Sequence, residues 1–262
     1  MRLTKAWRSI AIATGLLVGF GPAGTVAAQT YTVGTAIAPF GFVDSATGEP
    51  AGYSVDVMGA IAEDAGFDIT FTVFPTFGEL LPALLDGSVD IAAGPSTVTA
   101  ARVDMGIAFS GVYARHTDAL IVLGTDTQQY TSVNDLAGEA VGADNGTIYW
   151  DYLKKVQESG APFKEVVDTA ATSDGDQAEA LRQGIVKGEL TASFRLPFEQ
   201  MRGEWGDIRA VETYVPVLPS ATAIAVREAD TDLLGVIQAS LSKLLANGTL
   251  AELTEEWGIN PP

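Results

Sequence analysis

The chain has 262 residues and carries 15 lysines and arginines against 33 aspartates and glutamates, a formal net charge of −18 at pH 7. Such an acidic chain is a poor partner for nucleic acid or an anionic membrane surface, and we expect neither. It contains no cysteine, which excludes disulfides, thiolate metal sites and a cysteine-linked lipid anchor.

The first 28 residues have the pattern of a secretory signal peptide. Arg2, Lys5 and Arg8 precede an apolar run at 10–20, and Val26-Ala27-Ala28 offers small residues for cleavage. The apolar run is too short to span a membrane, and the absence of an Arg-Arg pair favours the general secretion route. We therefore expect cleavage after Ala28 and a soluble, periplasmic protein.

Short apolar strands alternate with helical patterns after this segment, which predicts an α/β fold with mostly parallel sheets. The leucines of the second helix recur at helical spacing, and Asp86-Gly87 ends that helix with turn chemistry. The first predicted elements are strands at Tyr31–Ala36, Ile69–Phe74 and Val89–Ala93, and helices at Ser54–Ala65 and Thr76–Leu85.

Polar side chains gather just after the third of these strands. Thr97, Thr99 and Arg102 follow its C-terminal end, where open α/β sheets bind ligands. A guanidinium holds a carboxylate through two parallel hydrogen bonds, so Arg102 is a candidate anion clamp. The alternatives are that the threonines cap a helix and that Arg102 pairs with a surface acid such as Asp104.

A second set of α/β units begins near Ala119–Leu123. Its predicted elements are strands at Ala140–Ala143, Phe163–Val167, Thr191–Phe194, Ile208–Val211 and Ala221–Val226, and helices at Thr147–Glu158 and Gln177–Gln183. Two amphipathic helices close the chain, one striped by Leu233, Ile237, Leu241 and Leu244 and one by Leu250, Leu253 and Trp257.

The run Leu80–Tyr113, LLPALLDGSVDIAAGPSTVTAARVDMGIAFSGVY, resembles the signature of the bacterial extracellular solute-binding proteins, family 3. These are amino-acid-type periplasmic binding proteins of ABC transporters, and their signature reads L-x-P-A-L-x-x-G-x-x-D … S/T-I-T-x-x-R … F-S-x-x-Y. The final run from Ala223, with its return strand, Gly-Thr break and terminal tryptophan helix, resembles the family's closing signature. The resemblance spans essentially the whole chain after residue 28.

The resemblance implies a type II periplasmic binding protein, with two α/β lobes around a central cleft and a two-segment hinge. Lobe 1 is expected to be discontinuous, built from residues 29–115 and 220–262, and lobe 2 from residues 116–219. The hinge segments are expected near Ala114–Ala119 and Pro216–Ala221.

The family's binding residues map onto this chain one by one. Arg102 would bind the ligand's carboxylate, Thr97 would contact the ligand, and Thr99 would order the turn. Phe77 and Phe40 would form the pocket wall against the ligand's apolar part. For Phe42 a wall position and a core position stay open.

The second lobe would contribute the segment Asp144-Asn145-Gly146-Thr147. It precedes a predicted helix, whose N-terminus offers free N–H groups and the positive end of the helix dipole. The resemblance implies that Asn145 and Thr147 meet the ligand from this side. The alternative is an ordinary turn with Thr147 as a helix cap.

Arg195 is a departure from the family pattern. Relatives carry an aspartate here that binds the ligand's ammonium, which a cation would repel. If Arg195 faces the cleft, a dicarboxylate, keto acid or other organic acid fits better than a standard amino acid. The alternative is that Arg195 points away and pairs with Glu199 one helical turn later. Pro95, where relatives have glycine, is a second departure.

The implied function is capture of a small carboxylate-bearing solute, an amino acid or related organic acid, for an ABC permease in the inner membrane. We expect a monomer. We also expect no catalytic residues, cofactor or metal, since a lone His116 and the Asp174-Gly175-Asp176 loop lack the spacing of a metal or catalytic site. The alternatives are a dehydratase-like enzyme of the same fold and a ligand-sensing partner of a membrane receptor.

Overall fold

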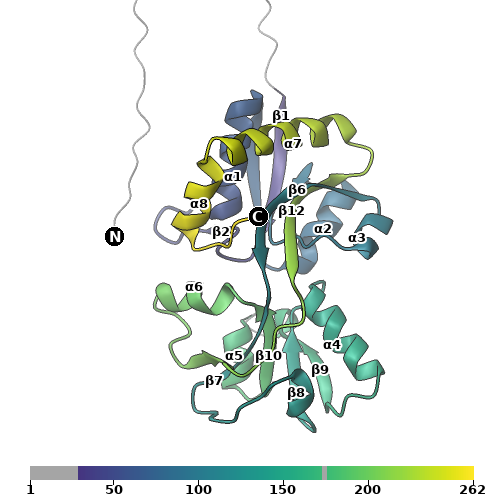
Figure 1. Ribbon diagram of the computed structural model, residues 1–262, viewed down its shortest axis with the longest axis vertical. Helices are drawn as coiled ribbons and strands as arrows, with labels where there is room; N and C mark the ends of the chain where they lie inside the picture. The colour runs from purple at the N-terminus through teal and green to yellow at the C-terminus, as the bar shows by residue number, and fades with distance from the viewer. Residues whose placement is uncertain (1–28, 173–175) are drawn as a thin grey trace, which may run out of the picture.

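The computed structural model describes residues 29–172 and 176–262. The predicted signal peptide lies outside these residues. Two α/β lobes stand one above the other, each built on a five-stranded sheet, and two extended segments run between them (Figure 1). This is the predicted fold class.

The sheet of the first lobe has the strand order β4-β1-β5-β12-β6. Strands β1 and β4 run parallel over seven residue pairs, from Thr30 with Asp68 to Ala36 with Phe74. Strand β12 enters antiparallel between β5 and β6. The strand bounds are β1 Thr30–Ala36, β4 Asp68–Phe74, β5 Ile91–Ala92, β6 Ile107–His116 and β12 Ser220–Arg227.

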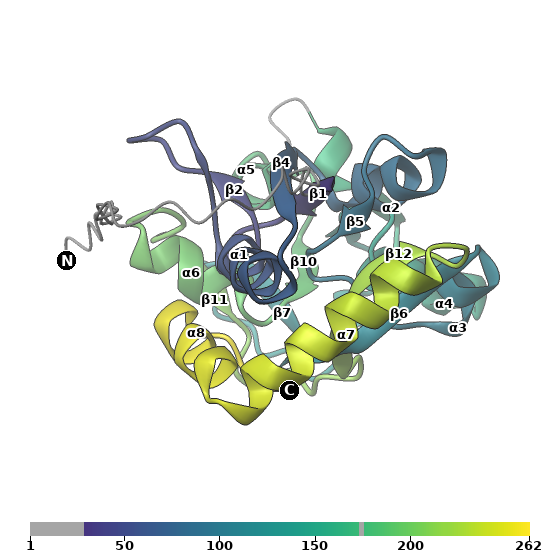
Figure 2. The same cartoon turned by 90° about the horizontal axis from the view of Figure 1, so that it is seen from above.

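Helices from both ends of the chain cover this sheet (Figure 2). Helix α2 ends at Gly87 in the left-handed conformation, as the Asp-Gly turn predicts. The bounds are α1 Tyr53–Ala65, α2 Phe77–Asp86, α3 Ala100–Asp104, α7 Thr231–Ala246 and α8 Thr249–Trp257, and a small hairpin joins β2 Phe42–Val43 to β3 Pro50–Ala51.

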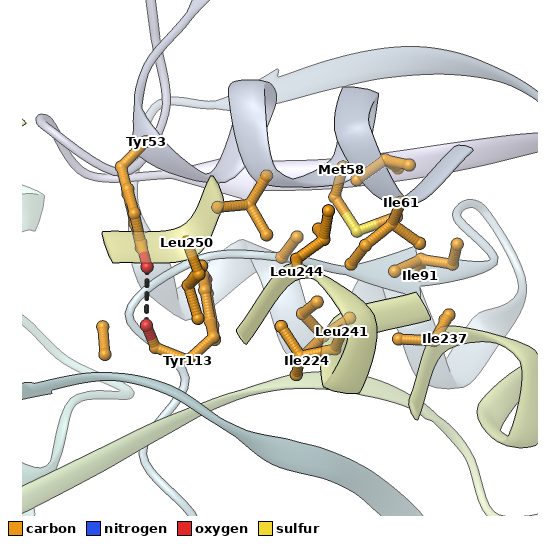
Figure 3. Packing of buried hydrophobic residues seen from close by; sticks show 14 of the residues in the cluster. Tyr53, Met58, Ile61, Ile91, Tyr113, Ile224, Ile237, Leu241, Leu244 and Leu250 are labelled. Atoms are coloured by element: carbon orange, nitrogen blue, oxygen red, sulfur yellow. Dashed lines mark hydrogen bonds between the residues drawn. The ribbon is translucent and has the colours of Figure 1, made fainter. Parts of the chain in front are cut away.

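The core of the first lobe joins α1 to the C-terminal helices. Met58 and Ile61 of α1 pack with Ile237 and Leu241 of α7 in one buried cluster (Figure 3). At one end of that cluster the Tyr53 hydroxyl donates a hydrogen bond of 2.6 Å to the Tyr113 carbonyl. The N-terminal and C-terminal parts of the chain therefore share a single core, which the predicted stripe on α7 completes.

The sheet of the second lobe has the order β11-β7-β10-β8-β9. Its strands are β7 Asp118–Leu123, β8 Ala140–Ala143, β9 Glu165–Asp168, β10 Gly188–Ala192 and β11 Ile208–Ala210. Its helices are α4 Ile148–Glu158, α5 Gln177–Arg182 and α6 Arg195–Met201, with 3₁₀ turns η1 Val133–Leu136 and η2 Thr169–Ala171.

Both sheets are mixed, whereas the sequence predicts mostly parallel sheets. The α/β units do pair in parallel, as β1 with β4 and β8 with β9 show. The antiparallel pairs involve the strands next to the lobe crossings, where β12 meets β6 and β10 meets β7. A strand that comes from the other lobe enters the sheet from the opposite end, so it runs antiparallel to its neighbours. The hydrophobic pattern of a strand does not show in which direction the strand runs.

The crossing segments leave the first lobe side by side. Strand β6 ends at His116 and β7 begins at Asp118, while β12 begins at Ser220 and pairs with β6 from that residue on. The division into residues 29–115 with 220–262 and residues 116–219 stays a prediction, and this connectivity supports it.

Candidate ligand-binding site

A pocket with about 430 Å³ of empty space lies between the two lobes. The first lobe contributes Phe77 at the start of α2, Pro95 and Thr97 after β5, and Arg102 on α3. The second lobe contributes the ends of β8 and β10 and the first turns of α4, α5 and α6. This mixture of apolar walls with a few polar groups suits a small organic ligand.

Arg102 is the central cation of the pocket and is 7% exposed. Its Nη1 donates to the Thr97 carbonyl at 2.7 Å, and its Nη2 reaches the Gly146 carbonyl of the second lobe at 3.2 Å. The guanidinium lies over the Phe77 ring, 5.0 Å from its centroid. Burial lowers the pKa of Arg102, but a guanidinium stays protonated at any physiological pH.

Thr97 holds the Arg102 guanidinium through its backbone carbonyl, and Thr99 holds the Arg102 backbone through its hydroxyl. The Thr99 hydroxyl caps α3 and accepts a hydrogen bond from the Arg102 amide at 3.3 Å. Thr97 lines the pocket and pairs with Thr222 in an isolated bridge next to β12. Thr99 does not line the pocket, and its position matches the cap alternative.

The two phenylalanines predicted as walls occupy different places. Phe77 lines the pocket beneath Arg102. Phe40 does not line it: the ring is fully buried in the first lobe, edge-on to Tyr53 and Tyr113. The wall position on the hinge side belongs to Phe194, whose ring centroid lies 5.0 Å from that of Phe40. Phe40 is therefore a core residue that supports the wall.

Of the two residues predicted in the turn before α4, one lines the pocket and the other does not. Thr147 lines the pocket and caps α4, its hydroxyl accepting from the Trp150 amide at 3.3 Å. Asn145 is exposed and does not line the pocket, and its backbone N–H donates to Asp168 Oδ1 at 3.1 Å. The segment meets the first lobe through its backbone, because the Gly146 carbonyl accepts from Arg102.

Arg195 combines both of the alternatives that the sequence leaves open. It lines the pocket, and it also forms an ion pair of 3.1 Å with Glu199 one helical turn later. Its guanidinium lies 5.2 Å from the centre of the Trp205 ring and donates to the Ala38 carbonyl of the first lobe at 3.3 Å. Glu199 also pairs with Arg202 at 3.6 Å, so Arg195 faces the pocket as a cation whose charge Glu199 offsets only in part.

The structure adds pocket residues that the sequence interpretation did not select. Asp144 directly follows β8, Gln177 begins α5, and Tyr149 lies in the first turn of α4. The position of Asp144 at the C-terminal end of a parallel strand was a usable signal. Gln177 had none, because a polar residue at a helix start normally reads as a solvent-exposed cap.

His116 also lines the pocket, at the end of β6. Its Nδ1 lies 3.2 Å from the Thr222 hydroxyl on β12, and its ring packs edge-on against Phe194. Burial lowers the pKa of His116 to about 4, so the ring is neutral at physiological pH. In residues 29–172 and 176–262, no three histidine, aspartate or glutamate side chains gather in a way that could hold a metal ion.

Comparison with known proteins assigns the chain to a family. Residues 31–260 match the sequence profile of the bacterial extracellular solute-binding proteins, family 3. The chain belongs to this family. Amino-acid-binding protein AabA of Dichelobacter nodosus is 26% identical over 224 residues, which cover 84% of this chain and 83% of that protein.

Solved structures agree with this assignment. A putative L-cystine ABC transporter protein from Listeria monocytogenes superposes with a TM-score of 0.77 at 26% identity, covering 87% of this chain and 95% of that chain. A histidine kinase sensor domain gives a TM-score of 0.78 at 23% identity, covering 90% and 99%, and at that identity it shows the shared fold alone. The family and AabA are described as solute-binding proteins and not as enzymes. No helix in the described part of this solute-binding protein is long and apolar enough to cross a membrane.

Proposed function

We propose that this solute-binding protein captures a small solute bearing a carboxylate in the pocket between its lobes, as a periplasmic monomer, and presents it to an ABC permease. The ligand class is an amino acid or a related organic acid. The permease recognises the closed form, in which the two lobes come together around the ligand.

The observation that carries this proposal is the isolation of the Arg102 charge. Arg182 and Arg227 form ion pairs with aspartates, but no carboxylate of the described residues lies within ion-pair distance of Arg102. A buried cation without a counter-ion is costly, so the site favours an anion that completes it.

Arg102 also has guanidinium N–H groups that its two bonds to carbonyls do not use. A guanidinium has five N–H groups. The bonds to the Thr97 and Gly146 carbonyls use two of them, which leaves three. A carboxylate can therefore be held by paired hydrogen bonds while Phe77 covers the other side of the guanidinium.

Replacement of Arg102 with alanine tests this proposal. We would first find ligands by thermal shift, using carboxylic acids paired with their own amides, since a ligand of the folded state raises the melting temperature. Acids should raise it and the matching amides should not. In R102A the Kd of the acids, measured by calorimetry, should rise at least about 30-fold, as for other buried charge pairs that lose one partner.

Arg182→Ala is the matched control. Arg182 is a partly exposed arginine of α5 that pairs with Asp207 at 2.8 Å, and it does not line the pocket. R182A should leave the Kd of the acids unchanged. Equal binding of acids and amides, or an R102A protein that binds acids as the wild type does, would contradict the carboxylate proposal.

A further inference from the structure

The second lobe places the side-chain carboxamide of Gln177 in the pocket, and only one of its two polar atoms is hydrogen-bonded to the described residues. Gln177 lines the pocket, is 7% exposed, and donates from Nε2 to Asp144 Oδ2 at 2.8 Å. Its Oε1 is buried and has no hydrogen-bond partner within residues 29–172 and 176–262. A buried acceptor without a partner is rare in a folded protein and points to a group that arrives from outside.

Counting protons behind Gln177 fixes the direction of its amide. The Thr169 hydroxyl lies 3.1 Å from Asp144 Oδ1 and 2.8 Å from Glu189 Oε1, yet it has one proton to give. One of the two carboxyl groups must therefore be protonated and donate to Thr169.

Glu189 is the group that holds this proton. It is completely buried, and its Oε2 has no partner in the described part of the chain. Burial raises the pKa of Glu189 well above its ordinary value. Burial also raises the pKa of Asp144, but the Arg195 charge and the bonds from Thr169 and Gln177 oppose that rise.

The chain of donors then runs from Glu189 through Thr169 to the Asp144 carboxylate. An ionised Asp144 accepts from Gln177 Nε2, so the amide cannot turn round without losing that bond. The Oε1 atom of Gln177 is consequently fixed as an acceptor for a bound molecule.

We propose that Gln177, held by Asp144, forms a second polar subsite that accepts a hydrogen bond from an N–H or O–H group of the ligand. The inference rests on the proposed function, because it takes Arg102 as the site of the ligand's carboxylate. Arg102 belongs to the first lobe, whereas Gln177 and Asp144 belong to the second. A carboxylic acid that also carries an amine, amide or hydroxyl group would bridge the lobes, whereas an acid without such a donor would leave Oε1 unpaired.

The test uses five acids on one carbon skeleton, titrated by calorimetry. Valerate has no donor, whereas α-hydroxyvalerate, norvaline, δ-hydroxyvalerate and δ-aminovalerate each carry one. At least one donor-bearing acid should bind the wild-type protein about tenfold or more tightly than valerate, since an unpaired buried acceptor is costly. The hydroxy and amino members of each pair distinguish a neutral donor from an ammonium beside Arg195.

Two variants separate the subsite from the fold. Gln177→Met removes the acceptor, and Asp144→Asn offers an N–H that turns the Gln177 oxygen away from the pocket. In each variant the Kd of the preferred acid should become equal to that of valerate in the same variant, so that the tenfold preference is lost. Gln183→Met, at the exposed end of the same helix, is the control and should keep the preference.

The outcomes distinguish the two proposals. A preference that survives in both Q177M and D144N, or a wild-type protein that binds all five acids equally, overturns the subsite and leaves the role of Arg102 intact. Binding of these acids that persists unchanged in R102A contradicts the carboxylate proposal itself.

Discussion

Glu189 shows how one residue of the second lobe is set by its neighbours. It lies on β10 beside Gly142 of β8, which leaves just enough room for the carboxyl group: a Cβ at Gly142 would lie 1.9 Å from Glu189 Oε2. Thr169 is its hydrogen-bond partner. Such a carboxyl group is tolerated because it stays neutral.

Replacing Glu189 with glutamine should raise stability at high pH. The unfolded chain loses the Glu189 proton above the ordinary glutamate pKa near 4.5, whereas the folded state keeps it, so wild-type stability falls as pH rises from that value toward the raised pKa. Glutamine has no proton to lose. The free energy of unfolding of E189Q, from urea titration, should exceed that of wild type by at least about 1 kcal/mol at pH 8.

The comparison at low pH checks the cause of this effect. Near pH 4 the advantage of E189Q should vanish, because the unfolded wild-type chain then keeps the proton too. The control Glu165→Gln replaces an exposed glutamate at the start of β9, and this variant should not gain stability at pH 8. An E189Q protein that is less stable than wild type by the same amount at both pH values would show that Glu189 is ionised in the fold.

Sequence reasoning at this scale found the residues that belong to local motifs. Arg102 and Thr97 follow a strand end, which predicts a place at the pocket, whereas Phe77 was selected through the family resemblance; all three line the pocket. Phe40 was placed wrongly, because whether an aromatic faces a pocket or a core depends on Tyr53 and Tyr113, which come from other elements. Gln177 gained its role only from Asp144, 33 positions away.

Helix α2 of the first lobe touches the turn before α4 of the second at two glycines. A Cβ on Gly78 would lie 2.9 Å from the Asn145 carbonyl oxygen, and one on Gly146 would lie 2.8 Å from the Gly78 Cα. Gly146 also has a φ of +82°, which favours glycine. The two backbones approach this closely only because neither residue has a side chain.

Gly78→Ala should weaken ligand binding without weakening the fold. The added methyl group separates α2 from the Asn145 turn when the lobes are together, at a cost of about 1 kcal/mol or more, or roughly a fivefold rise in the Kd of acids that bind wild type. Within α2 itself alanine is the better helix former, so the melting temperature should not fall.

Gly235→Ala provides the matched control. Gly235 lies inside α7, and a Cβ there meets nothing within 4 Å. This variant should gain helix stability and keep the wild-type Kd. If G78A bound ligand as tightly as G235A, the close approach would be irrelevant to binding.

Element positions followed from sequence wherever an element is long and amphipathic. The helix predicted at Ser54–Ala65 is observed one residue longer, and the strand at Ala140–Ala143 has the predicted bounds. The strand predicted at Thr191–Phe194 instead lies at Gly188–Ala192, because Phe194 turns toward α6 and the pocket. Short elements such as α3 and α6 lack a full hydrophobic period and left no pattern to detect.

At the scale of the whole molecule, the lobes also meet outside the pocket. Phe42 of the first lobe has its ring centroid 5.7 Å from that of Phe198 on α6, and the guanidinium of Arg202, which follows α6, lies 5.5 Å from the centre of the Phe42 ring. On the other side Phe42 contacts Trp257 of α8. Phe42 does not line the pocket, so its contacts with Phe198 and Arg202 act on the arrangement of the lobes and not on the ligand directly.

Phe42→Ala should therefore lower affinity through the closed form. Losing the aromatic and cation–π contacts should cost about 1 kcal/mol and reduce the population of molecules with the lobes together. The apparent Kd of a bound acid should rise about fivefold, and the radius of gyration of the ligand-free protein, from small-angle scattering, should increase.

Val43→Ala is the neighbouring control. Val43 follows Phe42 on the same strand and is 53% exposed. This change should alter neither the Kd nor the radius of gyration. An F42A protein that matches V43A in both measurements would remove Phe42 from the closing contacts.

Sequence reasoning reached the whole-molecule architecture through the family resemblance, which the match over residues 31–260 confirms. The hydrophobic pattern alone predicts α/β units but not the mixed sheets. The direction of each strand in a sheet depends on where the chain crosses between the lobes. Contacts between lobes, such as Phe42 with Phe198, join residues more than 150 positions apart and leave no local trace in the sequence.

The position of β12 between β5 and β6 sets an order of events for a chain that emerges from its N-terminus. Every strand of the second sheet lies within residues 118–210, so that sheet is complete in sequence before Ser220 has appeared. The first sheet, although most of it is made earlier, waits with β5 and β6 unjoined until β12 arrives between them. We therefore expect the second lobe to complete its sheet first, and the first lobe, whose chain is made earlier, to complete its sheet only after β12 has arrived.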